Sequence, residues 1–178
     1  MQYTSRYKSK IGEILLACDG KNLTGLWFVG QKYFADNLDK EAFEKDLPIF
    51  ENAKQWLDVY FSGKAPSFTP SLAFENISSF RKRVWEIMLD IPFGKTSTYG
   101  KIAKQIEKET GERVSAQAVG GAVGHNSISL IIPCHRVLGS NSSLTGYAVG
   151  VDKKIKLLKL EGIDITKLTI PKDCKITL

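Results

Sequence analysis

The pattern of apolar and polar residues predicts strands in the first part of the chain. Residues 12–19 (GEILLACD) and 22–29 (NLTGLWFV) are short apolar runs that a glycine-containing turn separates. Apolar runs of this length, bounded by turn residues, are typical of strands in a hairpin.

A helix is predicted next, over residues 48–63, because apolar residues recur there at steps of three and four. Pro48 lies near its start and Gly63 just past its end, as is common at helix ends. The following stretch contains proline and serine without a helical period, which indicates a connection between domains. We therefore expect two domains, residues 1–79 and residues 80–178.

Helical periodicity dominates the second part of the chain. Residues 78–91 place apolar side chains on one face, with Ser79 as the expected cap. Two short helices are predicted over residues 98–109 and 115–126, the second capped by Ser115. A brief connection containing glycine joins them, so together they form a helix-turn-helix pattern.

A last helix is expected from its cap, Asp152, through Leu160, with Gly162 at the stop position. Gly120 and Gly121 lie inside the second helix of the helix-turn-helix, where each costs about 1 kcal/mol relative to alanine. Close packing against a neighbouring helix and close approach of a ligand backbone or base explain them equally well at this point.

The chain has the composition of a soluble globular protein, with 43% hydrophobic and 25% charged residues. No apolar run approaches the length of a membrane span, and the N-terminus lacks the apolar core of a signal peptide. We therefore expect a cytoplasmic protein that does not bind a membrane.

The net charge of +6 is unevenly distributed. Residues 1–79 contain 9 Lys and Arg against 10 Asp and Glu, whereas residues 80–178 contain 16 against 9. An excess of positive charge in one part suggests a polyanionic partner, most simply nucleic acid. A solvated lysine surface is the competing interpretation.

The segment 131–139 (IIPCHRVLG) places Cys134 beside His135 in a chain with three cysteines and two histidines. A structural zinc site needs four ligands and no second Cys/His pair exists, so we expect no metal. We expect an apolar strand that ends at Pro133, and adjacent residues on an extended chain point to opposite sides. A thiolate needs a base or a positive charge, which His135 could then supply through a turn or a bridging water. From these residues alone, a nucleophile and a buried spacer remain equally open.

Four segments together resemble the 6-O-alkylguanine-DNA alkyltransferases, also called methylated-DNA–protein-cysteine methyltransferases. They are IIPCHRVLG, AVGGAVGHN, LTGYAVGVDKKIKLLKLEG and FRKRVWEIMLDIPFGKTSTYGKIA, and they span essentially all of residues 80–162. The resemblance implies an α+β protein. Its N-terminal α/β domain would be ribonuclease-H-like, and its C-terminal domain mostly helical and winged helix-turn-helix-like.

The resemblance also implies roles for single residues. Cys134 would accept the alkyl group, His135 would activate it through a water, and Glu161 would orient the histidine. Asn126 would bridge the helix-turn-helix to the active-site segment. Tyr99 would assist rotation of the target phosphate and donate toward guanine.

Further residues would hold the base and the DNA. The base pocket is expected to be formed by the loop after the active site and by the backbone of the acceptor segment: Tyr147, Ala148, Val149 and Val137. DNA contacts are expected from the two helices of the helix-turn-helix: Ser115, Gln117, Gly120, Gly121, Lys101 and Lys104.

Three positions depart from the commonest family pattern. Gln117 stands where an arginine often fills the gap left by the flipped base, and Ser127 stands where proline is usual. Val149 replaces a common glycine in the pocket loop, so we predict that benzyl adducts react more slowly than methyl adducts.

The implied function is DNA repair in a single turnover, and the resemblance implies no cofactor. The protein would flip alkylated guanine out of duplex DNA and transfer the alkyl group from guanine O6, and possibly thymine O4, irreversibly to Cys134. It would act as a monomer in the minor groove of double-stranded DNA, with little sequence preference. One rival is a non-catalytic helix-turn-helix damage sensor or regulator. The other is a cysteine hydrolase, which would turn over many times.

Overall fold

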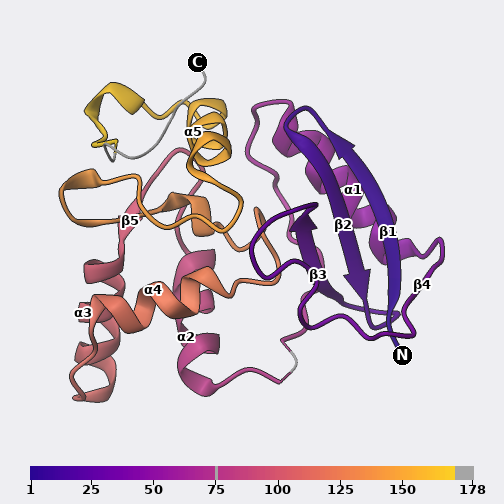
Figure 1. The fold of residues 1–178 in the computed structure, drawn as a ribbon, viewed down its shortest axis with the longest axis horizontal. Coiled ribbons are helices and arrows are strands. Elements are labelled where there is room, and N and C mark those ends of the chain that lie inside the picture. Colours follow the sequence, from indigo (N-terminus) through magenta and orange to yellow (C-terminus); the bar gives the residue numbers. More distant parts are fainter. Residues whose placement is uncertain (75, 171–178) are drawn as a thin grey trace. The chain divides into compact units, whose positions relative to one another are not determined.

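The computed structural model describes residues 1–74 and 76–170, and the chain forms two compact units (Figure 1). Unit 1 contains Met1–Asn76 together with Ser127–Ile131. Unit 2 contains Ile77–Asn126 and the chain from Ile132 onward. The short segment Ser127–Ile131 therefore belongs to unit 1, although it comes from the second part of the chain. The expected division after residue 79 does not include this segment in the first domain. Cys174 lies outside the described residues.

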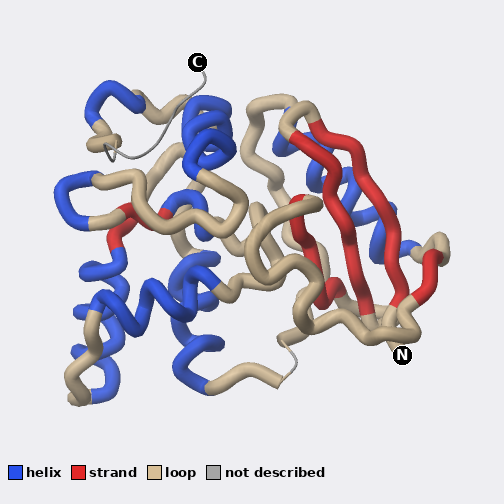
Figure 2. Tube along the Cα trace, viewed as in Figure 1, coloured by secondary structure: helices blue, strands red, loops and turns tan. Residues whose placement is uncertain are grey.

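Unit 1 is built on a sheet with the strand order β3-β2-β1-β4 (Figures 1 and 2). The predicted hairpin is confirmed, because β2 (Gly12–Cys18) pairs antiparallel with β3 (Leu23–Phe28). The apolar pattern did not predict β1 (Tyr3–Ser9), which pairs antiparallel with β2, or the two-residue β4 (Phe43–Glu44), which runs parallel to β1. The sequence of β1 is mostly polar, so it lacks the apolar run that indicated its neighbours.

Helix α1 (Pro48–Phe61) confirms the helix predicted there, with Pro48 in its first turn and Gly63 in a left-handed conformation just beyond it. Its apolar stripe contacts β1, β2 and β3, and the core of the unit forms between them. The buried side chains of α1 recur every three or four residues: Ile49, Phe50, Ala53, Trp56, Leu57, Tyr60 and Phe61.

Two distant segments complete the outer edge of β3. Leu72, from the stretch after α1, bridges to Leu23. The backbone N–H of Leu26 donates to Ser127 at 2.8 Å, and that of Ser129 donates to Leu26 at 2.9 Å. The chain therefore leaves unit 2 after Asn126, covers the open edge of the unit 1 sheet, and returns to unit 2 at Ile132.

Unit 2 is mostly helical, as expected. Four helices of nine or more residues are described there: α2 (Ser79–Leu89), α3 (Tyr99–Thr110), α4 (Ala116–Gly124) and α5 (Val151–Leu160). A short parallel pair joins β5 (Ser97–Thr98) to β6 (Val137–Leu138). The indole N–H of Trp85 on α2 donates to the carbonyl of Ala122 on α4 at 2.9 Å, which ties the helix-turn-helix to α2.

Two of the three expected helix caps are wrong by one or two positions. The hydroxyl that accepts from the first turn of α2 belongs to Ser78, not Ser79, because the extended backbone of Ser78 turns its side chain back onto the helix. Helix α5 begins at Val151 after Gly150, so Asp152 lies in the first turn, where its charge still complements the helix dipole. Ser115 caps α4 as predicted.

None of the helices in the described ranges is long and apolar enough to cross a membrane.

Candidate functional site

The acceptor segment approaches the site through two tight turns. Leu130 is fully buried with a left-handed φ of 70°, and the N–H of Ile131 closes a three-residue turn onto Ser129 at 2.9 Å. Pro133 forms a second one, with the N–H of Cys134 donating to Ile132 at 2.8 Å. The expected extended strand up to Pro133 is therefore wrong, since these local turns use the backbone groups that a strand would pair.

The next three residues form a single 3-10 turn, η1 (Cys134–Arg136). Sequence reasoning placed Cys134 and His135 on opposite sides of an extended chain. In the 3-10 turn the two side chains follow a helical path instead, about a third of a turn apart. Both side chains are buried.

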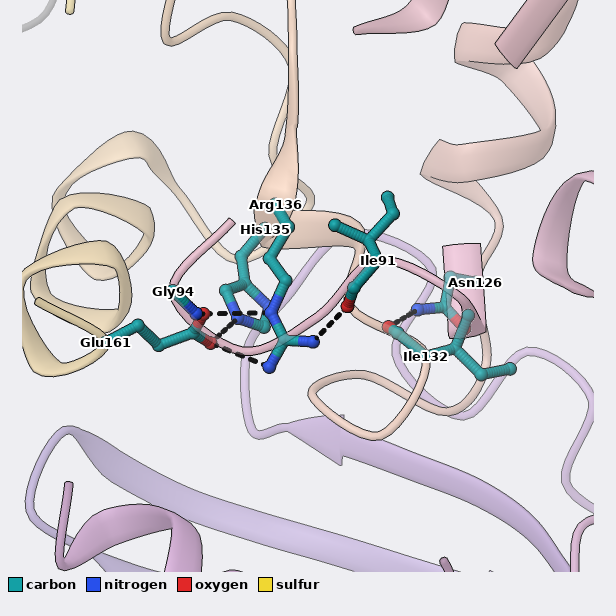
Figure 3. Close-up of polar contacts among 7 residues, drawn as sticks. All are labelled: Ile91, Gly94, Asn126, Ile132, His135, Arg136 and Glu161. Carbon is teal, nitrogen blue, oxygen red and sulfur yellow. Dashed lines mark hydrogen bonds and ion pairs between the residues drawn. The ribbon is translucent and has the colours of Figure 1, made fainter. Parts of the chain in front are cut away.

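The thiol of Cys134 accepts a hydrogen bond from the side-chain amide of Asn126, whose Nδ2 lies 3.2 Å from Sγ. The same Nδ2 donates to the carbonyl of Ile132 at 2.8 Å (Figure 3). Burial raises the pKa of Cys134 above its ordinary value, although the Asn126 amide and the charge of Lys154 act in the opposite direction. The resting thiol therefore holds its proton and needs a base to lose it.

Glu161 lies at the C-terminal end of α5 and accepts from three residues (Figure 3). Nε2 of His135 lies 2.6 Å from Oε1, and Nε of Arg136 lies 2.8 Å from Oε2. The N–H of Gly94 donates to Oε2 at 3.1 Å. Burial favours the neutral acid, but the hydrogen bonds from His135 and Arg136 outweigh it and lower the pKa of Glu161 to about 2. The carboxyl group is thus ionised.

His135 is fully buried, and this burial lowers its pKa even though Glu161 favours the charged form. The imidazole is therefore neutral at neutral pH. Because an ionised carboxylate can only accept, Nε2 carries the hydrogen and Nδ1 carries the lone pair. This tautomer can receive a proton at Nδ1 while Glu161 stabilises the resulting cation.

Arg136 fixes the carboxylate from the other side. Its Nη2 also donates to Glu161 at 3.1 Å, its Nη1 donates to the carbonyl of Ile91 at 2.7 Å, and its guanidinium lies over the ring of Phe93. Arg136 is buried, so its contacts are those of a structural partner of Glu161.

Tyr99, the first residue of α3, is tied to the loop that follows the acceptor segment. Its hydroxyl donates to the carbonyls of Gly146 at 3.1 Å and Thr145 at 3.3 Å. Burial, with a smaller contribution from Cys134, raises the pKa of Tyr99 to about 12. The phenol therefore keeps its proton at neutral pH and can donate it.

Two of the expected pocket residues lie next to the acceptor turn. Tyr147 is buried with its ring centroid 6.5 Å from that of His135, and Val137 is fully buried directly after η1. Ala148 and Val149 are half-buried in the same loop as Tyr147.

The residues expected to contact DNA lie on the surface of α3 and α4. Five of them are exposed: Ser115, Gln117, Gly121, Lys101 and Lys104. Gly120 is half-buried, and a Cβ added to it would meet only the Tyr99 ring, at an ordinary 3.9 Å. A Cβ at Gly121 would meet no described atom within 4 Å. Tight helix packing therefore does not explain these glycines.

Sequence reasoning missed Lys154, which is fully buried on α5. Its ammonium donates to the carbonyls of Val137 at 2.6 Å and Thr145 at 3.3 Å. The segment DKKIKLLKLEG reads as a solvated run of lysines. However, Lys154, Leu158 and Glu161 recur at steps of four and three, which places this lysine on the buried face.

A buried cysteine thus lies next to a His–Glu pair, on a unit with a helix-turn-helix, which is a motif of DNA-binding proteins. Comparison of the sequence with known proteins identifies the family within this class. Residues 79–163 match the family model described as "6-O-methylguanine DNA methyltransferase, DNA binding domain", and residues 2–74 match "6-O-methylguanine DNA methyltransferase, ribonuclease-like domain".

Similar proteins span nearly the whole chain. The methylated-DNA–protein-cysteine methyltransferase of Methanosarcina acetivorans is 42% identical over 160 residues, which are 90% of this chain and 98% of that protein. The Haemophilus influenzae protein of the same name is 37% identical over 90% of this chain and 87% of its own.

Solved structures agree. The Mycobacterium tuberculosis O6-methylguanine methyltransferase has a TM-score of 0.77 at 39% identity, covering 90% of this chain and 93% of that one. A structure of the M. tuberculosis protein in complex with DNA has a TM-score of 0.77 at 37% identity and covers 94% of both chains. The chain belongs to the 6-O-methylguanine-DNA methyltransferase family, as the resemblance predicted.

Proposed function

We propose that the protein repairs alkylated DNA by moving the alkyl group from guanine O6 to the sulfur of Cys134, once per molecule. The observation that carries this proposal is the buried thiol, hydrogen-bonded by Asn126 and adjacent to the His135–Glu161 pair, in a chain of this family. Alkylated thymine O4 is a second substrate by the same chemistry.

Activation begins with loss of the thiol proton. The neutral His135 takes this proton at Nδ1, through a bridging water, and Glu161 stabilises the imidazolium that forms. The amide of Asn126 donates to the sulfur, which favours the thiolate over the thiol. The Asn126 amide thus acts against the burial that holds the proton on Cys134, and His135 removes the proton.

The thiolate then attacks the alkyl carbon. A carbon–sulfur bond forms as the carbon–oxygen bond to guanine breaks, and the electron pair of the broken bond leaves with the base. The phenol of Tyr99 supplies the proton that guanine takes up. The product is a thioether, and nothing in this set of residues reverses it, so each molecule reacts once without a cofactor.

DNA reaches this site through the exposed faces of α3 and α4. Lys101 and Lys104 contact phosphates, and the N-terminus of α4 at Ser115 receives another phosphate. The small surface at Gly120 and Gly121 lets the DNA approach closely.

The target nucleotide is rotated out of the duplex, with Tyr99 assisting at its phosphate. Gln117 fills the gap that it leaves. The base enters the pocket formed by Tyr147, Ala148, Val149 and the backbone of Val137. In this proposal the protein binds the minor groove as a monomer. It has little sequence preference, because its contacts are mainly to the backbone of DNA.

Mass spectrometry tests the proposal directly. After mixing with a duplex that contains O6-methylguanine, the protein is expected to gain one methyl group on Cys134, and the Cys134→Ala variant none. Cys18 serves as an internal control, because its thiol is buried like that of Cys134 but its hydrogen bonds come from the backbone and not from a side chain such as Asn126.

The two rivals give different outcomes. A damage sensor would bind the alkylated duplex and gain no methyl group. A cysteine hydrolase would convert many molecules of an ester or amide per molecule of protein, whereas the proposed reaction stops when product and protein are equal in amount.

A further inference from the structure

Helix α5 carries a row of lysines on the side opposite its buried face. Lys153, Lys156 and Lys159 recur there at steps of three, and we call them the α5 lysine stripe. Lys156 and Lys159 are exposed, and Lys153 is half-buried. Each step advances about 4.5 Å along the helix axis, so the three charges span about 9 Å. The proposed chemistry of Cys134 does not use them.

The charge of the stripe is not neutralised within the helix. Lys156 and Lys159 form no ion pair inside the described ranges of the chain. Asp152 lies in the first turn of the same helix, yet it is beyond ion-pair distance of both lysines. Burial lowers the pKa of Lys153, and the charge of Lys156 lowers it further. Like charges held together cost free energy, which a bound anion would offset.

The stripe lies apart from the helix-turn-helix within unit 2. Figure 1 places α5 at one end of this unit and α3 with α4 at the other, with β5 between them. Lys101 and Lys104 are exposed on α3, and the stripe is on α5. The excess of positive charge in the second part of the chain is therefore divided between two separate surfaces.

The form of the stripe favours DNA as its partner. A row of ammonium groups suits a row of phosphates, and each DNA strand has one phosphate per about 3.4 Å of helix axis. An anionic membrane would also attract lysines, but a helix that binds one has large apolar side chains beside them. The exposed large apolar side chains of the described residues all lie outside α5. The family model that matches this part of the chain is that of a DNA-binding domain.

We propose that the α5 lysine stripe binds the phosphate backbone of a second DNA segment while α3 and α4 hold the first, so that one molecule bridges two duplexes. The inference rests on the proposed function only in that α3 and α4 bind DNA. Lysine contacts to phosphates read no bases. The second segment therefore needs neither a particular sequence nor an alkylated base.

A bead assay with unmodified duplexes tests this proposal. A short biotinylated duplex on beads first captures the protein, and unbound protein is washed away. A fluorescent duplex of another sequence is then added, and the bead fluorescence measures the second duplex that is retained. The amount of protein captured reports binding of the first duplex and verifies that each variant is folded.

Two triple variants change the stripe. One combines Lys153→Met, Lys156→Met and Lys159→Met, and the other replaces the same residues by Arg, which keeps the charge. Methionine and arginine are both good helix formers, so α5 should be preserved. A matched control removes the same net charge from exposed positions of unit 1. It combines Lys10→Met, Lys21→Met and Lys40→Met.

We expect the wild-type protein to retain the fluorescent duplex. Three phosphate contacts correspond to a salt slope of about 2.7, so the affinity for the second duplex should fall about 40-fold between about 50 and 200 mM salt. At the lower salt concentration the Met variant of the stripe should retain the second duplex on the order of tenfold less than wild type. The Arg variant and the unit 1 control should stay close to wild type.

Several results would overturn the proposal. A wild-type protein that retains no second duplex would do so. Equal retention by the Met variant would assign the bridge to another surface or to association of two copies of the protein. An equal loss in the unit 1 control would show that net charge is the cause. Phosphatidylserine vesicles that bind the protein through the stripe when the fluorescent duplex does not would make a membrane the partner.

This assay contains no alkylated DNA, so its outcome is separate from that of methyl transfer. A wild-type protein that bridges two duplexes but takes no methyl group from the alkylated duplex would refute the proposed repair reaction alone. Methyl transfer by a wild-type protein that retains no second duplex would refute the role of the α5 lysine stripe alone.

Discussion

At the scale of single residues, Glu161 is the group on which the site depends most. It accepts from His135, Arg136 and Gly94, so it holds the base, a buried cation and a backbone turn at once. Removing the charge leaves Arg136 buried without its counter-charge, which costs several kcal/mol in typical proteins. The same change removes the group that selects the His135 tautomer.

Glu161→Gln is therefore expected to slow methyl transfer and to lower the free energy of unfolding. The pKa of Glu161 is about 2 in the folded protein against an ordinary 4.5, so the stabilisation is fully present above 4.5 and is lost as pH falls toward 2. The difference in unfolding free energy between wild type and variant should be on the order of 3 kcal/mol at pH 6. Urea unfolding at pH 6 and pH 3 measures it, and the difference should be smaller at pH 3.

Exposed Glu112 provides the control, since Glu112→Gln should leave the unfolding free energy nearly unchanged at both pH values. If the difference in unfolding free energy between wild type and the Glu161→Gln variant stays constant down to pH 3, that result would contradict the charged state assigned to Glu161.

Val149 tests the size of the base pocket. It is half-buried in the loop that carries Tyr147, and its side chain adds bulk where glycine is common in the family. Val149→Gly is expected to speed benzyl transfer more than methyl transfer, because only the larger adduct needs the space. Single-turnover rates on duplexes with each adduct give the ratio. Equal wild-type rates on both adducts, with no effect of the substitution, would show that the bulk of Val149 does not restrict the larger adduct.

At the scale of elements, the loop between η1 and α5 is held by Tyr99. Gly146 has a left-handed φ of 67°, and a Cβ added there would lie 3.1 Å from the Tyr99 hydroxyl. Gly146→Ala is therefore expected to lower the free energy of unfolding by about 1 kcal/mol, because alanine is strained at this φ. In addition, the new Cβ should displace the Tyr99 hydroxyl from its two carbonyls.

Gly111→Ala isolates the backbone part of this effect. Gly111 has a φ of 73°, and a Cβ there meets no described atom within 4 Å. Both variants should lower the melting temperature, but only Gly146→Ala should also slow methyl transfer. Equal transfer rates in the two variants would show that the contact of Tyr99 with the loop does not matter for the reaction.

The elements also show where sequence reasoning succeeds. The helices follow from the spacing of apolar residues, and the resemblance marked Cys134, His135, Asn126 and Glu161. The structure joins these residues in two hydrogen-bonded pairs, Asn126 with Cys134 and His135 with Glu161. Lys154 was missed because a charged residue among lysines looks solvated unless its helical face is known. The turns at Leu130 and Pro133 were missed because apolar residues before a proline look like a strand.

At the scale of the whole molecule, the positive charge lies in the part of the chain that carries the helix-turn-helix. If Lys101 and Lys104 each contact a phosphate, removing both should reduce the slope of log affinity against log salt by about 2. The measurement is binding of unmodified duplex DNA by the Lys101→Met, Lys104→Met double variant over a range of salt concentrations.

Exposed Lys64 in unit 1 is the control, and Lys64→Met should leave the slope unchanged. A double variant with the wild-type slope would show that these lysines contribute only to the solvated surface. That result would revive the interpretation of the charge as a lysine surface without a partner, and it would do so without affecting the chemistry of Cys134.

The packing of Ser127–Ile131 on the edge of β3 affects how the protein folds during its synthesis on the ribosome. The N-terminal unit cannot close when its own first 76 residues have been made, because its last edge segment is still to be translated. Cys134 is added three residues after that segment ends. The order of translation thus makes completion of the first unit and synthesis of the acceptor cysteine nearly simultaneous, so the nascent chain exposes an open sheet edge before Cys134 is added.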